Sequence, residues 1–208
     1  MKINIKKTKI LPVNFTKKYD FIPKFTLENR PLDVVYNEKL LGVMIQSDCK
    51  WGGNTNHMVS RARKRIWQLR RLKLLRAPLH ILIDVYKLYV RSRLEMAVPL
   101  WGGALTKKNI KDIESVQVNC LQIITGDTSK SYEQSMKELG LETLAERRDK
   151  LNPKWAKKNV KNPRFSHWFP VREGYETRGK KKYIEPMAKT KRFLTSSIPH
   201  LIRLLNAE

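Results

Sequence analysis

Residues 58–76 combine an apolar stripe with a dense run of basic side chains, and this combination limits what the segment can form. Apolar residues recur there at intervals of three or four, which predicts one buried face of an α-helix: Met58, Ala62, Ile66, Leu69 and Leu72. Basic residues occupy the rest of the segment, with no acidic residue among them: Arg61, Arg63, Lys64, Arg65, Arg70, Arg71, Lys73 and Arg76. We therefore predict an amphipathic helix that packs through its stripe and presents its remaining surface to an anion.

The whole chain carries an excess of positive charge. Its 208 residues include 43 Lys+Arg and 19 Asp+Glu, which gives a formal charge of +24. The net charge is +5 over residues 1–50, +9 over 51–100, 0 over 101–150 and +10 over 151–208, so a neutral block separates two basic ones. A chain this basic favours a polyanionic partner, with nucleic acid ahead of an anionic membrane or a merely solvated surface.

Other features of the sequence narrow the class of protein. Hydrophobic residues make up 41% of the chain, enough to bury a core. Apolar runs are short, as at residues 81–83, and a membrane-spanning helix needs roughly 20 apolar residues. No apolar stretch follows the basic N-terminus, and Cys49 and Cys120 give neither a disulfide framework nor a metal-binding spacing. We expect an intracellular protein, in the nucleus or cytoplasm, that is not secreted.

The N-terminal quarter has the pattern of short strands. Residues 21–27 and 32–36 flank the turn-like tetrapeptide 28–31, and residues 40–45 form an apolar run. Gly42 within that run indicates a bulge or a close backbone approach.

Helical patterns begin near Thr55 and continue to about residue 160. A second helix starting at Pro78 has so many apolar positions that it should be the most buried, and Pro99 with Gly102-Gly103 should end it. A third helix runs from an N-cap at Thr106 to Gly126. Capping boxes follow at residues 131–134 and 143–146, and the sequence Asn152-Pro153 should break or kink the second of the two helices. From residue 162 we predict an extended basic tail with one weak helix at 198–205.

The predicted fold class is therefore α+β and mostly α. A small N-terminal β-hairpin or sheet piece precedes a helical bundle, and an irregular basic tail follows it.

The sequence offers no pattern typical of catalysis. It has no Asp-Asp or Asp-x-Asp pair of the kind that two metal ions share, and Glu146 is better explained as a capping-box partner than as a catalytic partner of Glu142. No phosphate-binding glycine loop, nucleophile elbow or Cys-x-x-Cys occurs. The histidines lack the spacing of an iron or zinc site: they are His57, His80, His167 and His200. We expect a binding module without a catalytic site, a metal or a cofactor of its own.

Five stretches between residues 1 and 150 occur in a particular order. The first is Asn4-Ile5-Lys6-Lys7-Thr8-Lys9-Ile10 followed by Asn14-Phe15, and the second is Leu40-Leu41-Gly42-Val43 with Asp48 and Trp51. The third contains Ala62, Arg65, Leu69, Arg70 and Arg71. The fourth contains Tyr86, Arg91-Ser92, Leu94-Glu95, Ala97 and Pro99-Leu100-Trp101. The fifth contains Ile113-Glu114-x-Val116-Gln117, Ile123-Ile124-Thr125-Gly126, Ser131-Tyr132, Leu139-Gly140-Leu141 and Leu144-x-Glu146-Arg147-Arg148.

Together these stretches resemble the C-terminal part of non-LTR, jockey-like retrotransposon reverse transcriptases. The resemblance implies palm-end strands and a hairpin over residues 1–53, a helical thumb-like bundle over 54–151 and a basic, partly irregular tail over 152–208. The catalytic carboxylates of such a polymerase would lie upstream, with the rest of its palm and its fingers. Asn152-Pro153 interrupts a segment that is a continuous helix in the family, which fits a decayed or truncated copy of the transposable element.

The function that this resemblance implies is binding of nucleic acid without catalysis. This part of an RNA-directed DNA polymerase would grip the primer-template duplex, RNA or RNA–DNA, through its phosphates. Nucleotide addition and its divalent metal would belong to the complete polymerase, so the chain alone is not expected to be an enzyme. The basic residues of 61–76 would face the duplex, Leu41, Gly42 and Val43 would form a primer-grip-like hairpin, and Lys7 and Lys9 are candidates for contact with the nucleotide.

Several alternatives stay open at this stage. The basic helix could be merely solvated, residues 41–44 could be a buried hairpin strand, and Trp67 could stack on a base but is more often a core residue at such a position. Lys180, Lys181 and Lys182 could bind phosphates, act as a localisation signal or be a solvated tail. Residues 56–73 are also similar to the N-terminal region of AlkB homologue 8, a tRNA-modifying protein, without its iron ligands. A non-catalytic basic scaffold or membrane-surface module is the alternative from a different class.

Overall fold

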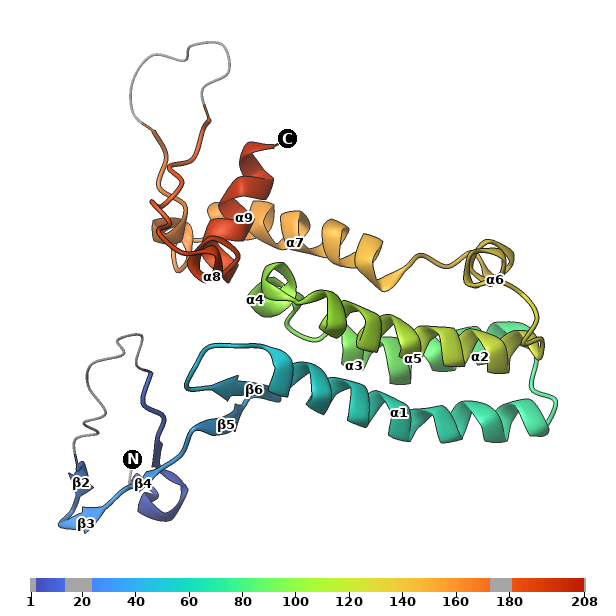
Figure 1. Cartoon of the computed structure of the whole chain (residues 1–208), viewed down its shortest axis with the longest axis horizontal. Helices are drawn as coiled ribbons and strands as arrows, with labels where there is room; N and C mark the ends of the chain where they lie inside the picture. Colours follow the sequence, from blue (N-terminus) through green and yellow to red (C-terminus); the bar gives the residue numbers. More distant parts are fainter. Residues whose placement is uncertain (1–2, 14–23, 173–180, 208) are drawn as a thin grey trace. The chain divides into compact units, whose positions relative to one another are not determined.

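The computed structural model describes residues 3–13, 24–172 and 181–207 (Figure 1). Contacts within the chain divide it into two units, Met1–His57 and Met58–Glu208, and each is described by itself. The first unit holds short strands and the second is almost wholly helical, which confirms the α+β, mostly α fold class.

The first unit contains three two-stranded pairings. β1 pairs with β4 in parallel, and β2–β3 and β5–β6 are antiparallel hairpins. The elements, including a short 3₁₀ turn η1, are η1 (Ile5–Lys7), β1 (Lys9–Ile10), β2 (Thr26–Leu27), β3 (Arg30–Pro31), β4 (Asp33–Val34), β5 (Asn37–Leu40) and β6 (Val43–Gln46). The strands expected at 21–27 and 32–36 are thus present only as shorter pieces, and residues 14–23 lie outside the described part of the chain.

The hairpin that the resemblance predicts at Leu41, Gly42 and Val43 is present, and its turn lies inside the apolar run at residues 40–45. Leu41 and Gly42 have φ values of 48° and 91°, as a two-residue type I′ turn requires at both central positions. Gly42 is therefore a turn residue rather than a bulge. The side chain of Leu41 is 94% exposed, and Val43 is buried at 6%.

The second unit is built from helices of very different lengths. α1 begins at Gly52 in the first unit and continues across the boundary between the units. The elements are α1 (Gly52–Leu74), α2 (Leu79–Val85), η2 (Tyr86–Arg91), α3 (Ser92–Leu94), α4 (Val98–Trp101), η3 (Gly102–Ala104), α5 (Lys107–Thr125), α6 (Tyr132–Leu139), α7 (Leu144–Val160), η4 (Ser166–Trp168), α8 (Lys191–Leu194) and α9 (Ser197–Asn206).

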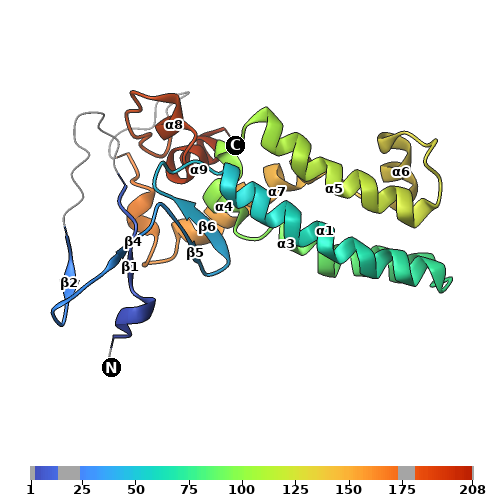
Figure 2. The same cartoon turned by 60° about the horizontal axis from the view of Figure 1, so that its bottom comes forward.

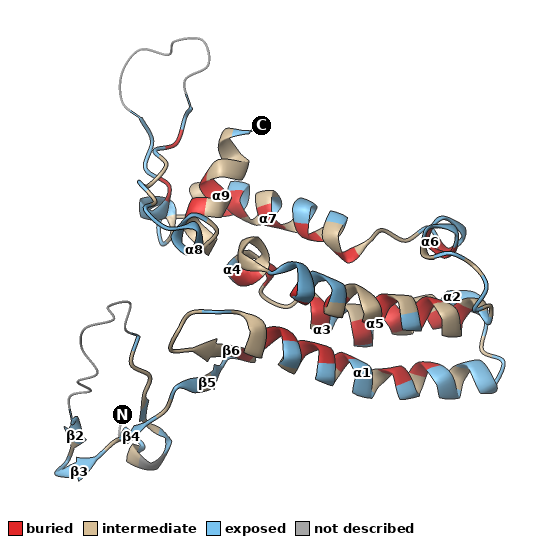
Figure 3. Ribbon diagram, viewed as in Figure 1, coloured by how far each residue is buried: buried red, intermediate tan, exposed pale blue. Residues whose placement is uncertain are grey.

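The predicted stripe of α1 lies in the core. Met58, Ala62, Ile66 and Leu69 are each at most 5% exposed, whereas Leu72 is half-buried. In the part of α1 that belongs to the second unit, buried positions alternate with exposed ones along the helix (Figure 3). α5 lies beside this part of α1 in both views (Figures 1 and 2), and side chains from α1 bond to it.

The second helical segment differs from the prediction in shape and burial. η2 is a π-helix, and Ala97 has a φ of 55°, so the α-helical path ends before Pro99 rather than at it. Buried residues occur at every fourth position: Leu82, Tyr86, Val90 and Leu94. Leu88 and Tyr89 are 68% and 50% exposed, and α5 has more buried positions, so the expectation that this helix is the most buried one is wrong.

The capping signals in the sequence are confirmed. Thr106 caps α5 through the backbone N–H of Asn109, Gly126 follows α5 with a φ of 75°, and both predicted capping boxes are formed. The Glu146 carboxylate accepts from the N–H of Thr143, as its interpretation as a capping partner requires. The predicted break at Asn152-Pro153 is absent, because α7 continues through Pro153 to Val160.

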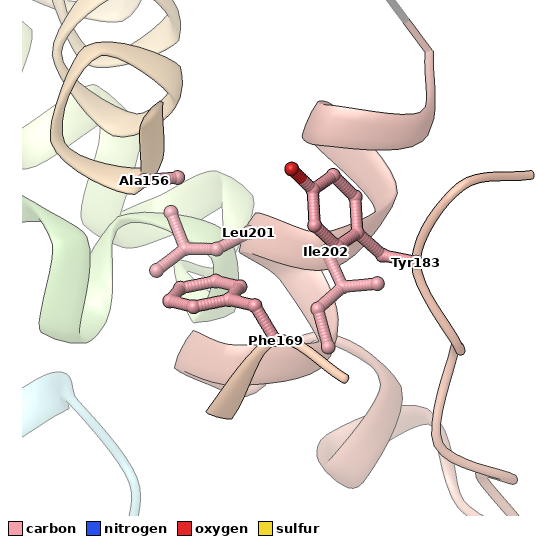
Figure 4. Packing of buried hydrophobic residues seen from close by; sticks show 5 residues of the cluster. All are labelled: Ala156, Phe169, Tyr183, Leu201 and Ile202. Atoms are coloured by element: carbon pink, nitrogen blue, oxygen red, sulfur yellow. The ribbon is translucent and has the colours of Figure 1, made fainter. Parts of the chain in front are cut away.

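The C-terminal segment contains a small core that the sequence did not suggest. Its buried residues come from α7, from the chain before and after residues 173–180, and from α9 (Figure 4): Ala156, Phe169, Tyr183, Leu201 and Ile202. Asn206 of α9 accepts from the N–H of Tyr183 and donates to its carbonyl, at 2.9 and 3.0 Å. In its described parts, the chain between α7 and α9 therefore packs against these two helices. The predicted helix at 198–205 is present as α9.

We expect Leu69→Ala to lower the free energy of unfolding by about 2–5 kcal/mol, because truncating a fully buried leucine removes apolar contacts and leaves a cavity. Leu74→Ala, at a position 77% exposed on the same helix, should change it by less than about 0.5 kcal/mol. Urea unfolding followed by circular dichroism measures both, and equal effects would contradict the assigned stripe.

Candidate nucleic-acid interface

The exposed face of α1 and the turn after it carry most of the predicted cationic residues. Arg63, Lys64, Arg70, Arg71 and Arg76 are exposed, and Arg61 and Arg65 are half-buried. No carboxylate in the described part of the chain forms an ion pair with any of the eight predicted basic residues. This face, which we call the α1 basic face and define as Arg63, Lys64, Arg70 and Arg71, therefore retains its charge for an external anion.

Lys73 differs from the other cations of the cluster. Its Nζ donates to the carbonyl oxygen of Ile124 at 2.7 Å, in the last turn of α5. A cation at a helix C-terminus satisfies an orphan carbonyl and interacts favourably with the helix dipole. Lys73 thus connects α1 to α5. Arg63 makes a weaker bond, with Nη2 donating to the Ser115 hydroxyl at 3.3 Å.

Trp67 and Tyr89 line an open surface groove of about 350 Å³. Its other lining residues come from the same two segments, α1 and α2–η2: Gln68, Arg71, Leu72 and Val85. Trp67 is 66% exposed, so the core position that its sequence context favoured is wrong. Three other tryptophans are less exposed: Trp101 is fully buried, and Trp51 and Trp155 are half-buried.

Charged residues of the fourth and fifth stretches pair with one another behind this face. Arg147 of α7 donates through Nε and Nη2 to the two carboxylate oxygens of Glu95, which is 14% exposed, and Arg91 lies 3.8 Å from the same carboxylate. The hydrogen bond to Glu95 is the main cause that raises the pKa of Arg147 above its ordinary value, and the negative charges of Glu95 and Glu142 raise it further. The pair fixes the end of α3 against α7.

Glu114 of α5 binds the start of α7. Its carboxylate accepts from the backbone N–H of Ala145 at 2.8 Å, from that of Leu144 at 3.3 Å and from the Tyr132 hydroxyl at 2.8 Å. The guanidinium of Arg148 lies 3.8 Å away and is almost fully buried. Burial, followed by the bond to Glu114, raises the pKa of Tyr132.

Gln117 makes the corresponding connection in the buried interior. Its Oε1 accepts from the Tyr86 hydroxyl at 2.7 Å, and its Nε2 donates to the carbonyl of Glu142 at 2.9 Å and lies 2.9 Å from the sulfur of Met136. Burial raises the pKa of Tyr86, so the phenol stays protonated and remains a donor. These contacts fix η2, the helix that carries Tyr89, to α5 and to the α6–α7 connection.

The other lysines predicted as site residues lie away from the α1 basic face in sequence, and Lys9, Lys181 and Lys182 have partners within the chain. Lys181 pairs with Glu185 at 2.9 Å, and the Lys182 ammonium lies 5.7 Å from the centre of the Tyr183 ring. Lys180 lies outside the described residues. In the first unit, Lys7 is exposed and Lys9 pairs with Glu38 at 2.6 Å, an interaction that holds the pKa of Glu38 below its usual value.

Within the described ranges, no three His, Cys, Asp or Glu side chains lie together as metal ligands would. The helices in those ranges include none with the length and apolar character that crossing a bilayer requires. No protein family, curated protein or solved structure matches the chain. The geometry of the α1 basic face and its groove is therefore the basis for any assignment of function.

We expect Lys73→Met to lower the free energy of unfolding by about 1 kcal/mol, because it removes a charged donor from the last turn of α5. Lys64→Met removes the same charge from an exposed position and should leave stability unchanged within about 0.5 kcal/mol. Chemical denaturation compares the two variants. A Lys73→Met protein as stable as the Lys64→Met protein would contradict the connecting role.

The two cysteines should differ in reactivity. Burial raises the pKa of the Cys120 thiol to about 12, so at pH 8 almost none of it is the reactive thiolate, whereas Cys49 is only half-buried. In the native protein a thiol reagent at pH 8 should label Cys49 first, and Cys120 should react only after unfolding. Mass spectrometry of the labelled peptides identifies the site, and rapid native labelling of Cys120 would show that the α5 core is open.

Proposed function

We propose that the chain is a nucleic-acid-binding module that holds an RNA or RNA–DNA duplex through its phosphates. The observation that carries the proposal is the α1 basic face. Its four cations extend over about two turns of one helix, and none has a carboxylate partner among the described residues. Cations spaced along a rigid element displace counterions from a phosphate backbone without recognising sequence.

Two bonds from α1 to α5 support this role by holding the helix in place: Lys73 donates to the Ile124 carbonyl and Arg63 to the Ser115 hydroxyl. Charged side chains of α5 and α7 also have partners within the chain. Arg147 of α7 pairs with Glu95, and Glu114 of α5 accepts hydrogen bonds from the start of α7. Residues 101–150 carry no net charge, so they do not add to the positive surplus. The largest shares of that surplus lie in residues 51–100, which contain α1, and in residues 151–208.

We further propose that the module derives from the thumb region of a non-LTR retrotransposon reverse transcriptase and has no polymerase activity alone. Residues from different stretches of the resemblance contact one another, with Tyr86 bonded to Gln117 and Glu95 to Arg147. Side chains that depend on each other in this way are expected to occur together in one family of folds. The genomic sequence upstream of Met1 tests the origin, and an in-frame Tyr-x-Asp-Asp codon run is the expected finding.

Neutralising the α1 basic face should weaken duplex binding and its dependence on salt. In the triple variant Lys64→Gln, Arg70→Gln and Arg71→Gln, fewer cations displace counterions from the duplex. The slope of log Kd against log salt should therefore fall by about 1 for each phosphate that one of these side chains neutralises in the native complex. Fluorescence anisotropy with a 20-base-pair duplex, titrated at several salt concentrations, measures the slope.

A matched control separates a specific face from bulk charge. Lys107, Lys108 and Lys111 are exposed at the start of α5, and replacing all three by glutamine removes the same charge. The control variant should bind with a nearly unchanged slope. Equal weakening of both triple variants, or no binding of the native chain at low salt, would overturn the assignment of the face.

A membrane-surface module is the second candidate, because three exposed leucines lie beside the cations. Leu74, Leu75 and Leu79 are 77%, 67% and 50% exposed at the α1–α2 turn. Apolar side chains next to basic ones are typical of segments that lie at an anionic bilayer surface. Strong binding to phosphatidylserine vesicles that an excess of duplex cannot displace would favour this candidate over the first.

A further inference from the structure

We propose that the groove formed by α1 and α2–η2 is a stacking site for one unpaired nucleobase, so that the module binds a duplex with a single-stranded extension more tightly than a blunt duplex. The inference rests on the proposed function, since the site supplements phosphate contacts made by the α1 basic face. It specifies a substrate: nucleic acid that combines paired and unpaired regions.

The first support is the exposure of two aromatic side chains in one groove. Trp67 and Tyr89 are 66% and 50% exposed, yet both line the same volume of about 350 Å³. Ligand sites usually measure about 300–1,000 Å³, and this groove lies near the lower end of that range. A volume of this size suits a small ligand such as a base or a nucleotide. Aromatic faces bind bases by stacking, and they accept any base because each has a π-face.

The second support is the π-helical geometry of η2. In an α-helix, residues four apart drift by about 40° around the axis. A π-helix has wider turns, so Tyr86 and Val90 both stay in the core while the residues between them face outward. The wider turn is thus what leaves Tyr89 at the groove. π-helical turns cost stability and are found frequently at functional sites.

The third support is the charge around the groove. Arg71 lines it, and Lys64 and Arg70 are exposed on the same helix within about two turns. No carboxylate contributes to the lining. A stacked nucleotide carries a phosphate on each side, so an aromatic surface edged by unpaired cations complements it better than it complements a neutral apolar peptide.

The test compares two RNA probes with the full chain. One is a blunt 16-base-pair duplex, and the other is the same duplex with a four-nucleotide single-stranded 3′ extension. We expect the native chain to bind the extended duplex about 5-fold or more tightly, the usual effect of one base stacked on an aromatic side chain. Fluorescence anisotropy at a fixed salt concentration gives both affinities.

Substitutions at Trp67 distinguish stacking from apolar contact. Trp67→Leu should abolish the preference for the extended duplex and leave blunt-duplex affinity unchanged, whereas Trp67→Phe should retain most of the preference. Trp168→Leu is the matched control, because it removes another partly exposed tryptophan that contacts Phe165 and His167. A Trp67→Leu protein that keeps the preference, or a native chain with none, overturns the stacking site.

These outcomes are separable from failure of the proposed function. If neither probe binds at low salt, the proposed function fails and the stacking site with it. If both probes bind equally, the duplex-binding function stands and the stacking site alone is wrong. Vesicle binding that Trp67→Leu weakens and excess extended duplex does not displace would assign the groove to a membrane instead.

Discussion

The carboxylate of Glu114 determines how the helices of the second unit are joined. A helix start leaves backbone N–H groups without partners, and here one side chain of α5 accepts from two of them at the start of α7 while also accepting from Tyr132 of α6. A negative charge at a helix N-terminus is favourable in itself. Three consecutive helices, α5, α6 and α7, therefore meet at one residue. Gln117, three residues further along α5, adds η2 to the same assembly.

The parts of the fold that depend on local chemistry could be predicted from the sequence. The stripe of α1, the capping boxes and the glycine after α5 involve residues within a few positions of one another, so spacing alone determines them. The capping role of Glu146 is of this kind. The tail is harder to predict, because its small core joins Phe169 and Tyr183 to α9 across residues that have no regular apolar period.

The errors in the candidate site have identifiable causes. Trp67 follows Ile66 in the sequence, which suggests that the two share their burial, but one step along a helix turns a side chain by about 100° and brings it outside the stripe. The π-helix could not be predicted, because the spacing of four at 82, 86, 90 and 94 is visible only in the burial of the folded chain. In the sequence it is hidden by further apolar residues at 81, 83, 85, 88 and 89. The bond from Lys73 to α5 could not be predicted, because no local pattern identifies the distant carbonyl. The continuation of α7 through Pro153 is likewise a case in which tertiary packing prevails over a local preference.

The absence of acidic residues from α1 has a consequence for folding as well as for binding. Its like charges repel, no Glu–Lys pair four residues apart supports the helix, and its stability comes from packing against α5 and α2. A polyanion that binds the formed helix more tightly than the unfolded chain relieves this repulsion in the folded state. By mass action, such an anion at free concentration [L] raises the free energy of unfolding by RT ln(1 + [L]/Kd). A polyanion that occupied α1 would thus also be a ligand for the native state of the chain.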